Sequence, residues 1–88
     1  FERRTENSTT IASGTASGGK AVTFANAFYT DGNTKVTVGI TAFGLASGDY
    51  YVMSEPTRTG FTITFKNGSS VIDRNFQYTA IGYGTEQT

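Results

Sequence analysis

Apolar and polar residues alternate with a period of two across the segment 60–84, GFTITFKNGSSVIDRNFQYTAIGYG. Such alternation is the pattern of a strand with one buried face, because successive side chains of a strand point to opposite sides. The residues expected to face the core are Phe61, Ile63 and Phe65 before the bend and Phe76, Tyr78 and Ala80 after it. Asn67 and Gly68 lie between the two halves, and Asn-Gly is the strongest short signal for a hairpin turn. We therefore predict a β-hairpin over residues 60–84 with its bend at 67–70.

The same alternation recurs earlier in the chain and predicts an all-β domain. Strands are expected at 9–15, 20–29, 35–43, 49–54, 61–66 and 76–81. Turn sequences such as Thr30-Asp31-Gly32-Asn33 separate them, and no window of ten or more residues has a helical pattern. Six short strands at intervals of roughly ten residues indicate an antiparallel sandwich or a small barrel. Residues 1–8 carry four charges without periodicity, so we interpret them as a lead-in segment or the end of a linker, and residues 9–88 as the single domain.

The outward faces of the predicted strands carry Thr, Ala, Gly and Gln with few charges, Lys66 being the clear exception. Exposed strands normally carry charges that block edge pairing and aggregation. A chain of 88 residues also buries little of its surface alone and often completes its core by oligomerisation. The pattern therefore favours contact with another copy of the chain. The alternative is that Thr, of which there are sixteen, simply suits exposed strands.

The residue types needed for catalysis or metal binding are scarce. The chain has no His and no Cys, so it lacks the commonest general base, thiolate metal ligands and disulfides. The carboxylates of Asp31, Asp49, Glu55 and Asp73 fall in separate loops, and no spacing pairs two of them for general acid–base catalysis. The Gly-rich segment 14–19 has no following helix that would bind phosphate. We predict that the chain is not an enzyme and holds no metal or cofactor.

Charge and hydropathy also bear on the partners of the chain. Seven basic and seven acidic residues cancel, so no net field attracts nucleic acid. No apolar run approaches the ~20 residues that a membrane-spanning helix needs, so no membrane insertion is expected. The absence of an initiating Met suggests a piece of a longer protein. The chain has five Tyr, and Tyr50, Tyr51, Tyr78 and Tyr83 lie in or near strand ends. They suit sugar recognition, although core packing with the hydroxyl at the rim is the alternative for each of them.

Five stretches of the chain together resemble a known family. They are GTASGGKAVTFANAF, KVTVGITAF, GDYYV, TGFTITFKN and FQYTAIGYG. In order and spacing they resemble the H-type lectin-like domains at the C-terminal ends of bacteriophage tail fibres and tail-tip proteins. The resemblance implies a six-stranded antiparallel β-sandwich, a homotrimer, and a place at the tip of a virion fibre. The sequence departs from the animal H-type lectins at Tyr78, where they have Trp, and in its lack of the His beside the sugar.

The order of the strands localises a candidate site. An even number of strands places both termini at one end, so the loops 13–19, 43–50 and 67–74 are expected together at the other end, which is also the end that the lectin family uses. The residues expected to bind a ligand are Asp49, Tyr50, Lys66, Asn67, Asp73 and Arg74.

These residues and the resemblance lead to one principal functional hypothesis. It is recognition of a bacterial surface glycan or an outer-membrane receptor by a trimeric fibre tip, outside the cell and as part of the virion. One alternative is a structural trimerisation or capping domain without receptor contact. A third hypothesis, a glycan-cleaving depolymerase, would need the carboxylate pair that the chain lacks.

Overall fold

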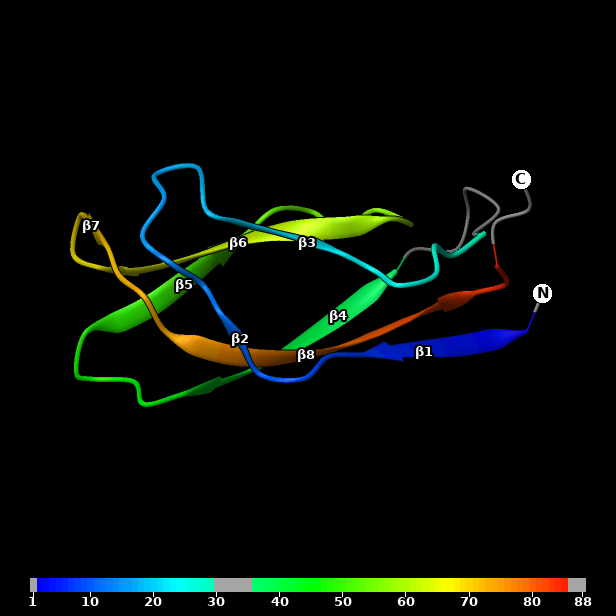
Figure 1. Cartoon of the computed structure of the whole chain (residues 1–88), viewed down its shortest axis with the longest axis horizontal. Helices are drawn as coiled ribbons and strands as arrows, with labels where there is room; N and C mark the ends of the chain where they lie inside the picture. Colours follow the sequence, from blue (N-terminus) through cyan, green and yellow to red (C-terminus); the bar gives the residue numbers. More distant parts are fainter. Residues whose placement is uncertain (1, 30–35, 86–88) are drawn as a thin grey trace.

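The computed structural model describes residues 2–29 and 36–85, and within these ranges it contains eight strands and no helix. The strands are β1 (Arg3–Asn7), β2 (Ile11–Ala12), β3 (Lys20–Thr23), β4 (Thr37–Phe43), β5 (Asp49–Met53), β6 (Gly60–Asn67), β7 (Ser70–Val71) and β8 (Asn75–Tyr83). Figure 1 shows them in two layers that run along the length of the molecule. The prediction of an all-β fold is therefore confirmed. The predicted turn at 30–33 lies outside the described residues.

Each of the two sheets is built around one long central strand. In the first, called the β8 sheet, β1 and β2 pair with one edge of β8 and β4 pairs with the other. In the second, called the β6 sheet, β3 and β7 pair with one edge of β6 and β5 pairs with the other. Every pairing is antiparallel, as the sequence predicted.

The hairpin predicted over residues 60–84 is wrong in its pairing. β6 and β8 belong to different sheets and face each other, with ring centroids 5.3 Å apart for Phe61 and Tyr78 and 5.8 Å apart for Phe65 and Phe76. The Asn-Gly turn does form, but the two-residue strand β7 closes it, and Gly68 has the positive φ of 62° that such turns need. Stacking explains the difference, because two strands that each have one apolar face bury both faces by packing against each other.

The core lies between the sheets and consists of the residues that the alternation places inward. The buried apolar residues are Val22, Phe24, Phe28, Val36, Phe61, Ile63, Phe65, Phe76, Tyr78 and Ala80. Val38, Ile40 and Ala42 of β4 are partly buried and pack against this cluster. Inward and outward faces were therefore predicted correctly for β6 and β8, and β3 and β4 show the same alternation. Burial also raises the pKa of the Tyr78 phenol, with a smaller contribution from the negative charge of Glu6.

The prediction of six strands did not include β1 or β7, and the interpretation of residues 1–8 as a lead-in segment needs correction. β1 pairs along its whole length with the second half of β8, from Arg3 opposite Tyr83 to Asn7 opposite Thr79. The missed signal is that Arg4 and Glu6, two residues apart on a strand, share one face, and that this face is the inner one. Charges in an inward position broke the apolar alternation on which the prediction relied.

The inward charges of β1 form a compact cluster at the end of the sheets where the chain begins. The Arg4 guanidinium donates to the carbonyls of Gly84, Asn26 and Ala27 at 3.1, 2.9 and 3.0 Å, and it also pairs with the Glu6 carboxylate. Its Cζ lies 4.3 Å from the ring centroid of Phe28, which is fully buried. Arg4 therefore links β1 to the end of β8 and to the segment that follows β3, and it covers one end of the core.

The two ends of the molecule differ as the sequence predicted. The start of β1 and the end of β8 are paired, so the chain enters and leaves the two layers at the same end. The loops after β2, β4 and β6 gather at the opposite end, on the left of Figure 1. We call this second end the loop end, and it holds the candidate residues.

Candidate functional site

Asp49 is the centre of the loop end, and both of its carboxylate oxygens accept hydrogen bonds within the chain. Oδ1 accepts from Asn67 Nδ2 at 2.8 Å, and Oδ2 accepts from the Ala46 N–H at 2.7 Å and from Arg74 Nε at 2.8 Å. The side chain of Asp49 has no exposed surface, whereas that of Arg74 is 27% exposed. Asp49 therefore joins the loop after β4 to the segment between β6 and β8 and does not offer its carboxylate to solvent.

These contacts keep Asp49 ionised in acid. The Ala46 N–H, the Asn67 amide and the Arg74 guanidinium together lower the pKa of Asp49 from 3.8 to about 2, while burial of the carboxylate acts in the opposite direction. Hydrogen bonds and an opposite charge stabilise the ionised form of a carboxylate, which is why the favourable contacts win. The group is therefore a permanent anion paired with a cation under ordinary conditions.

Asn67 and the tight turn before β5 explain how the network is built from local sequence. Asn67 lies opposite Asp49 in the register of β5 and β6, and its amide also donates to the Ser47 carbonyl at 3.1 Å. The Asp49 N–H donates back to the Ala46 carbonyl at 3.1 Å, so residues 46–49 close a turn on themselves. Gly48 supplies the positive φ of 87° that this turn requires.

Asp73 and Arg74 join the loop after β2 to the same network. Asp73 Oδ1 accepts from the Gly14 N–H at 2.9 Å, and Arg74 and Ser13 exchange hydrogen bonds through Arg74 N to Ser13 Oγ and Ser13 N to Arg74 O, both 2.9 Å. Ser13 is only 5% exposed, and the sequence reasoning missed it because Ser in a Gly-rich turn gives no distinct signal. Asp73 and Arg74 do not pair side chain to side chain. Arg74 pairs with Asp49 instead, which only the fold brings within reach.

Tyr50 and Lys66 lie beside the network on the outer face of the β6 sheet. They are opposite each other in the register of β5 and β6. The Tyr50 hydroxyl donates to the Gly68 carbonyl at 2.8 Å, which holds a ring that is 45% exposed against the β6–β7 turn. The exposed ring of Tyr50 and the ammonium group of Lys66 can therefore contact a ligand, whereas the carboxylate oxygens of Asp49 already accept hydrogen bonds within the chain.

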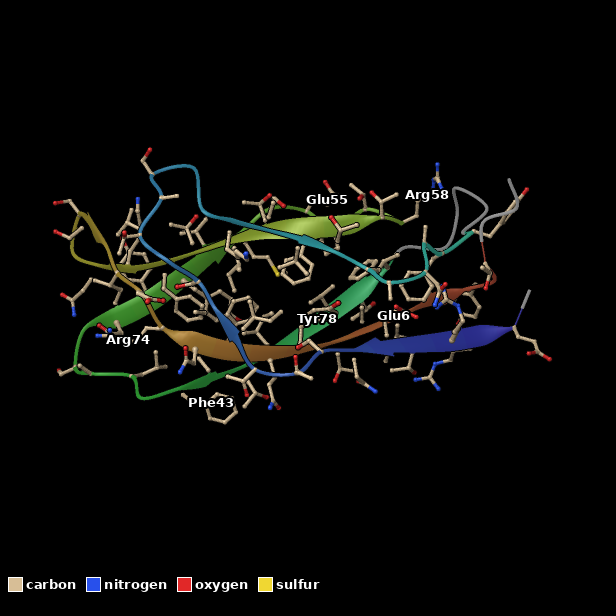
Figure 2. All side chains as sticks on the ribbon, in the orientation of Figure 1. Glu6, Phe43, Glu55, Arg58, Arg74 and Tyr78 are labelled. Carbon is tan, nitrogen blue, oxygen red and sulfur yellow. The ribbon has the colours of Figure 1, made fainter. Side chains whose placement is uncertain are left out.

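The structure thus brings all six predicted residues to one end of the molecule, where some of them hold the loops together and others lie on the surface. Asp49 and Asn67 hold the loops, and Asp73 ties the loop after β2 to them. Tyr50, Lys66 and the exposed part of Arg74 remain on the surface; Figure 2 shows Arg74 at the loop end, far from Glu6 and Arg58. No group of three or more acidic, His or Cys side chains suited to a metal ion is found in the described ranges.

Fold and site together define an all-β domain of two facing antiparallel sheets with a cross-linked set of loops at one end. The comparisons with known proteins add nothing to this description: no family model, no curated protein and no solved structure matches the chain. Among the described residues there is also no helix that could cross a membrane.

Proposed function

We propose that the chain is a receptor-binding module, the tip domain of a bacteriophage tail fibre or tail protein, and that its loop end contacts a bacterial surface glycan or an outer-membrane receptor. On this proposal the two sheets are an H-type lectin-like sandwich, and the domain acts outside the cell as part of the virion. The sequence resemblance of residues 10–84 supports the family, and the position of the loops opposite the chain ends supports the site.

One observation carries the proposal: hydrogen bonds hold the three loops in a fixed arrangement. Asp49 joins the loops after β4 and β6, and Asp73 and Arg74 join the loop after β2 to them. A preorganised surface loses little conformational entropy on binding, and rigid aromatic anchors contribute most where they are already ordered. Tyr50 is such an anchor, while Lys66 and Arg74 add positive charge for acidic or hydroxyl-rich groups. Each shallow site binds weakly, and several copies on one fibre raise the overall affinity.

The proposed copies would meet along the open edges of β4 and β5. β1 and β3, at the other edges of the two sheets, carry charges at Arg3, Arg4, Glu6 and Lys20. β4 has no charged residue, and β5 has only Asp49, whose charge is paired internally. Tyr51 and Val52 of β5 are 43% and 55% exposed, and Leu45 in the loop between β4 and β5 is 51% exposed. Uncharged edges with exposed apolar side chains are what associating surfaces retain and monomers avoid.

Light scattering on the 88-residue chain tests the trimer. Val52→Lys puts a charge on the β5 edge and is expected to give monomers with an unchanged circular dichroism spectrum. Thr23→Lys on the β3 edge is the matched control and should leave the trimer intact. A monomeric parent chain would contradict this part of the proposal.

A fluorescent fusion of the chain, incubated with a panel of bacterial strains, tests receptor binding. Tyr50→Ala is expected to weaken staining of bound cells at least about tenfold, because it removes the exposed ring of the site. Arg3→Ala, an exposed change at the opposite end, should have no effect. Equal staining by the two variants would place the binding surface elsewhere. A trimer that stains no strain in the panel would instead favour the structural capping role.

A further inference from the structure

β1 and β2 form one row along the same edge of β8, and a β-bulge interrupts this row. β1 pairs in the register Asn7 opposite Thr79, whereas β2 pairs in the register Ile11 opposite Phe76. Between these two pairs, three residues (8–10) lie opposite only two residues of β8 (77 and 78). The β1–β2 side therefore has one residue more than a regular ladder. Bulges bend a strand and redirect its side chains, and they are over-represented next to functional sites.

A hollow of about 180 Å³ lies at this bulge, on the outer face of the β8 sheet. Its lining consists of Asn7, Ser8, Thr41, Gln77, Tyr78 and Thr79. Hydrogen bonds fix the lining: Gln77 Nε2 donates to Thr10 Oγ1 at 3.0 Å, and Thr79 Oγ1 donates to Asn7 Oδ1 at 2.9 Å. Tyr78 N also donates to Ser8 Oγ at 2.8 Å, and Ser8 N donates to the Tyr78 carbonyl at 3.1 Å. Within the described residues, Asn7 Nδ2, Gln77 Oε1 and the Thr41 hydroxyl have no protein partner. Donor and acceptor groups thus remain available at one spot.

The surroundings of the hollow are uncharged. Among the outward-facing strand residues described for the β8 sheet only Arg3 is charged, and it lies at the end of β8 remote from the hollow. Gly39, directly opposite Thr79, has no side chain, and a Cβ placed there would meet nothing within 4 Å. The next outward residue of β4 after Thr41 is Phe43, which is 43% exposed and in Figure 2 points away from the space between the sheets.

We propose that this hollow, the bulge site, binds one ring of a neutral saccharide. The amides and hydroxyls of the lining would pair with sugar hydroxyl or acetamido groups, and the Phe43 face would cover a C–H-rich side of the sugar. An ionic ligand would find no counter-charge there. A volume of about 180 Å³ is below the ~300–1,000 Å³ of typical small-molecule pockets, which suits a single ring and weak binding. The bulge site uses none of the six candidate residues at the loop end, so it can be tested separately from the receptor contact proposed above.

Titration of the ¹⁵N-labelled chain with glucose, galactose and N-acetylglucosamine, each followed by amide chemical shifts, tests the bulge site. At least one of these sugars is expected to shift the amides of residues 7–10, 39–41 and 77–79 in a saturable manner. Gln77→Leu should weaken that binding about fivefold or more, since a hydrogen-bonding partner is lost. Gly39→Thr should abolish it by filling the open space opposite Thr79 while keeping the strand, because β-branched residues suit strands. Thr37→Val, on the same face of β4 but outside the hollow, is the matched control.

Several results would overturn the bulge site. They are the absence of saturable shifts with all three sugars, an equal response to glycerol, and shifts at the loop end alone. Shifts of these amides that follow dilution of the protein without sugar would instead identify the face as a contact between copies. Undiminished binding by a folded Gly39→Thr variant would also reject the site.

Discussion

Replacing Arg4 by Ala tests the finding that the first residues of the chain complete the core. The substitution removes a guanidinium that donates to three backbone carbonyls, pairs with Glu6 and covers the Phe28 ring. It leaves the Glu6 side chain, which is 12% exposed, without its cation. Removing one partner of a buried ion pair costs about 3–5 kcal/mol. Because the Arg4 side chain is itself 24% exposed and water can reach part of the cluster, we expect a loss of about 2–4 kcal/mol in the free energy of unfolding.

Urea denaturation followed by circular dichroism measures this loss directly. In a domain of this size 1 kcal/mol corresponds to about 4–8 °C in Tm, so in a thermal melt the variant should unfold at least about 8 °C below the parent chain. Arg4→Lys should recover only part of the stability, because an ammonium cannot reproduce the planar fork of donors. Arg3→Ala is the control, since Arg3 is the exposed neighbour on the opposite face of β1, and it should change stability by less than about 0.5 kcal/mol.

Equal stability of Arg4→Ala and Arg3→Ala would contradict the stabilising role of the Arg4 cluster. A double-mutant cycle with Glu6→Gln sharpens the test, because the direct contact of Arg4 with Glu6 predicts a coupling energy of about 0.5–3 kcal/mol. A coupling energy near zero would mean that Arg4 acts through the backbone carbonyls and the Phe28 ring and not through Glu6.

Three further changes probe other parts of the structure. Gly60→Ala should destabilise the chain by about 1–3 kcal/mol, because its Cβ would lie 1.9 Å from the Val22 carbonyl oxygen. Gly39→Ala places a Cβ that meets no atom within 4 Å, so it should be neutral or stabilising by up to about 1 kcal/mol. Urea titrations of the two variants compare these effects. Phe76→Ala should cost about 3–5 kcal/mol in the same assay, since the ring is fully buried between the sheets. The low pKa of Asp49 predicts a contribution to stability that is complete above about pH 4 and is lost as the pH falls through about 2, because over this range the unfolded state binds a proton at Asp49 more readily than the folded state. Asp49→Asn should remove this pH-dependent contribution. A pH profile of stability that is the same in the variant and the parent chain would contradict this role of Asp49.

The position of the candidate residues was predictable because it depends on the order of the strands. β1 and β2 run in the same direction along β8, but apart from them and the short β7 each strand reverses the direction of the chain, so alternate loops gather at one end whatever sheet each strand joins. The tasks of these residues were not predictable. Asp49 was expected to contact a ligand, yet Asn67 and Arg74, 18 and 25 residues away in sequence, occupy its carboxylate.

Which side chains face inward could be predicted from the pattern of residues, because alternation along a strand is a local property of the backbone. Phe61, Ile63 and Phe65 faced the core regardless of what lay beside their strand. Which strand lies beside which depends on contacts between distant parts of the chain, so it becomes visible only in the folded structure. A continuous pattern from Gly60 to Tyr83 became two central strands in opposing sheets, because packing their apolar faces together buries both of them and side-by-side pairing would have left one surface uncovered.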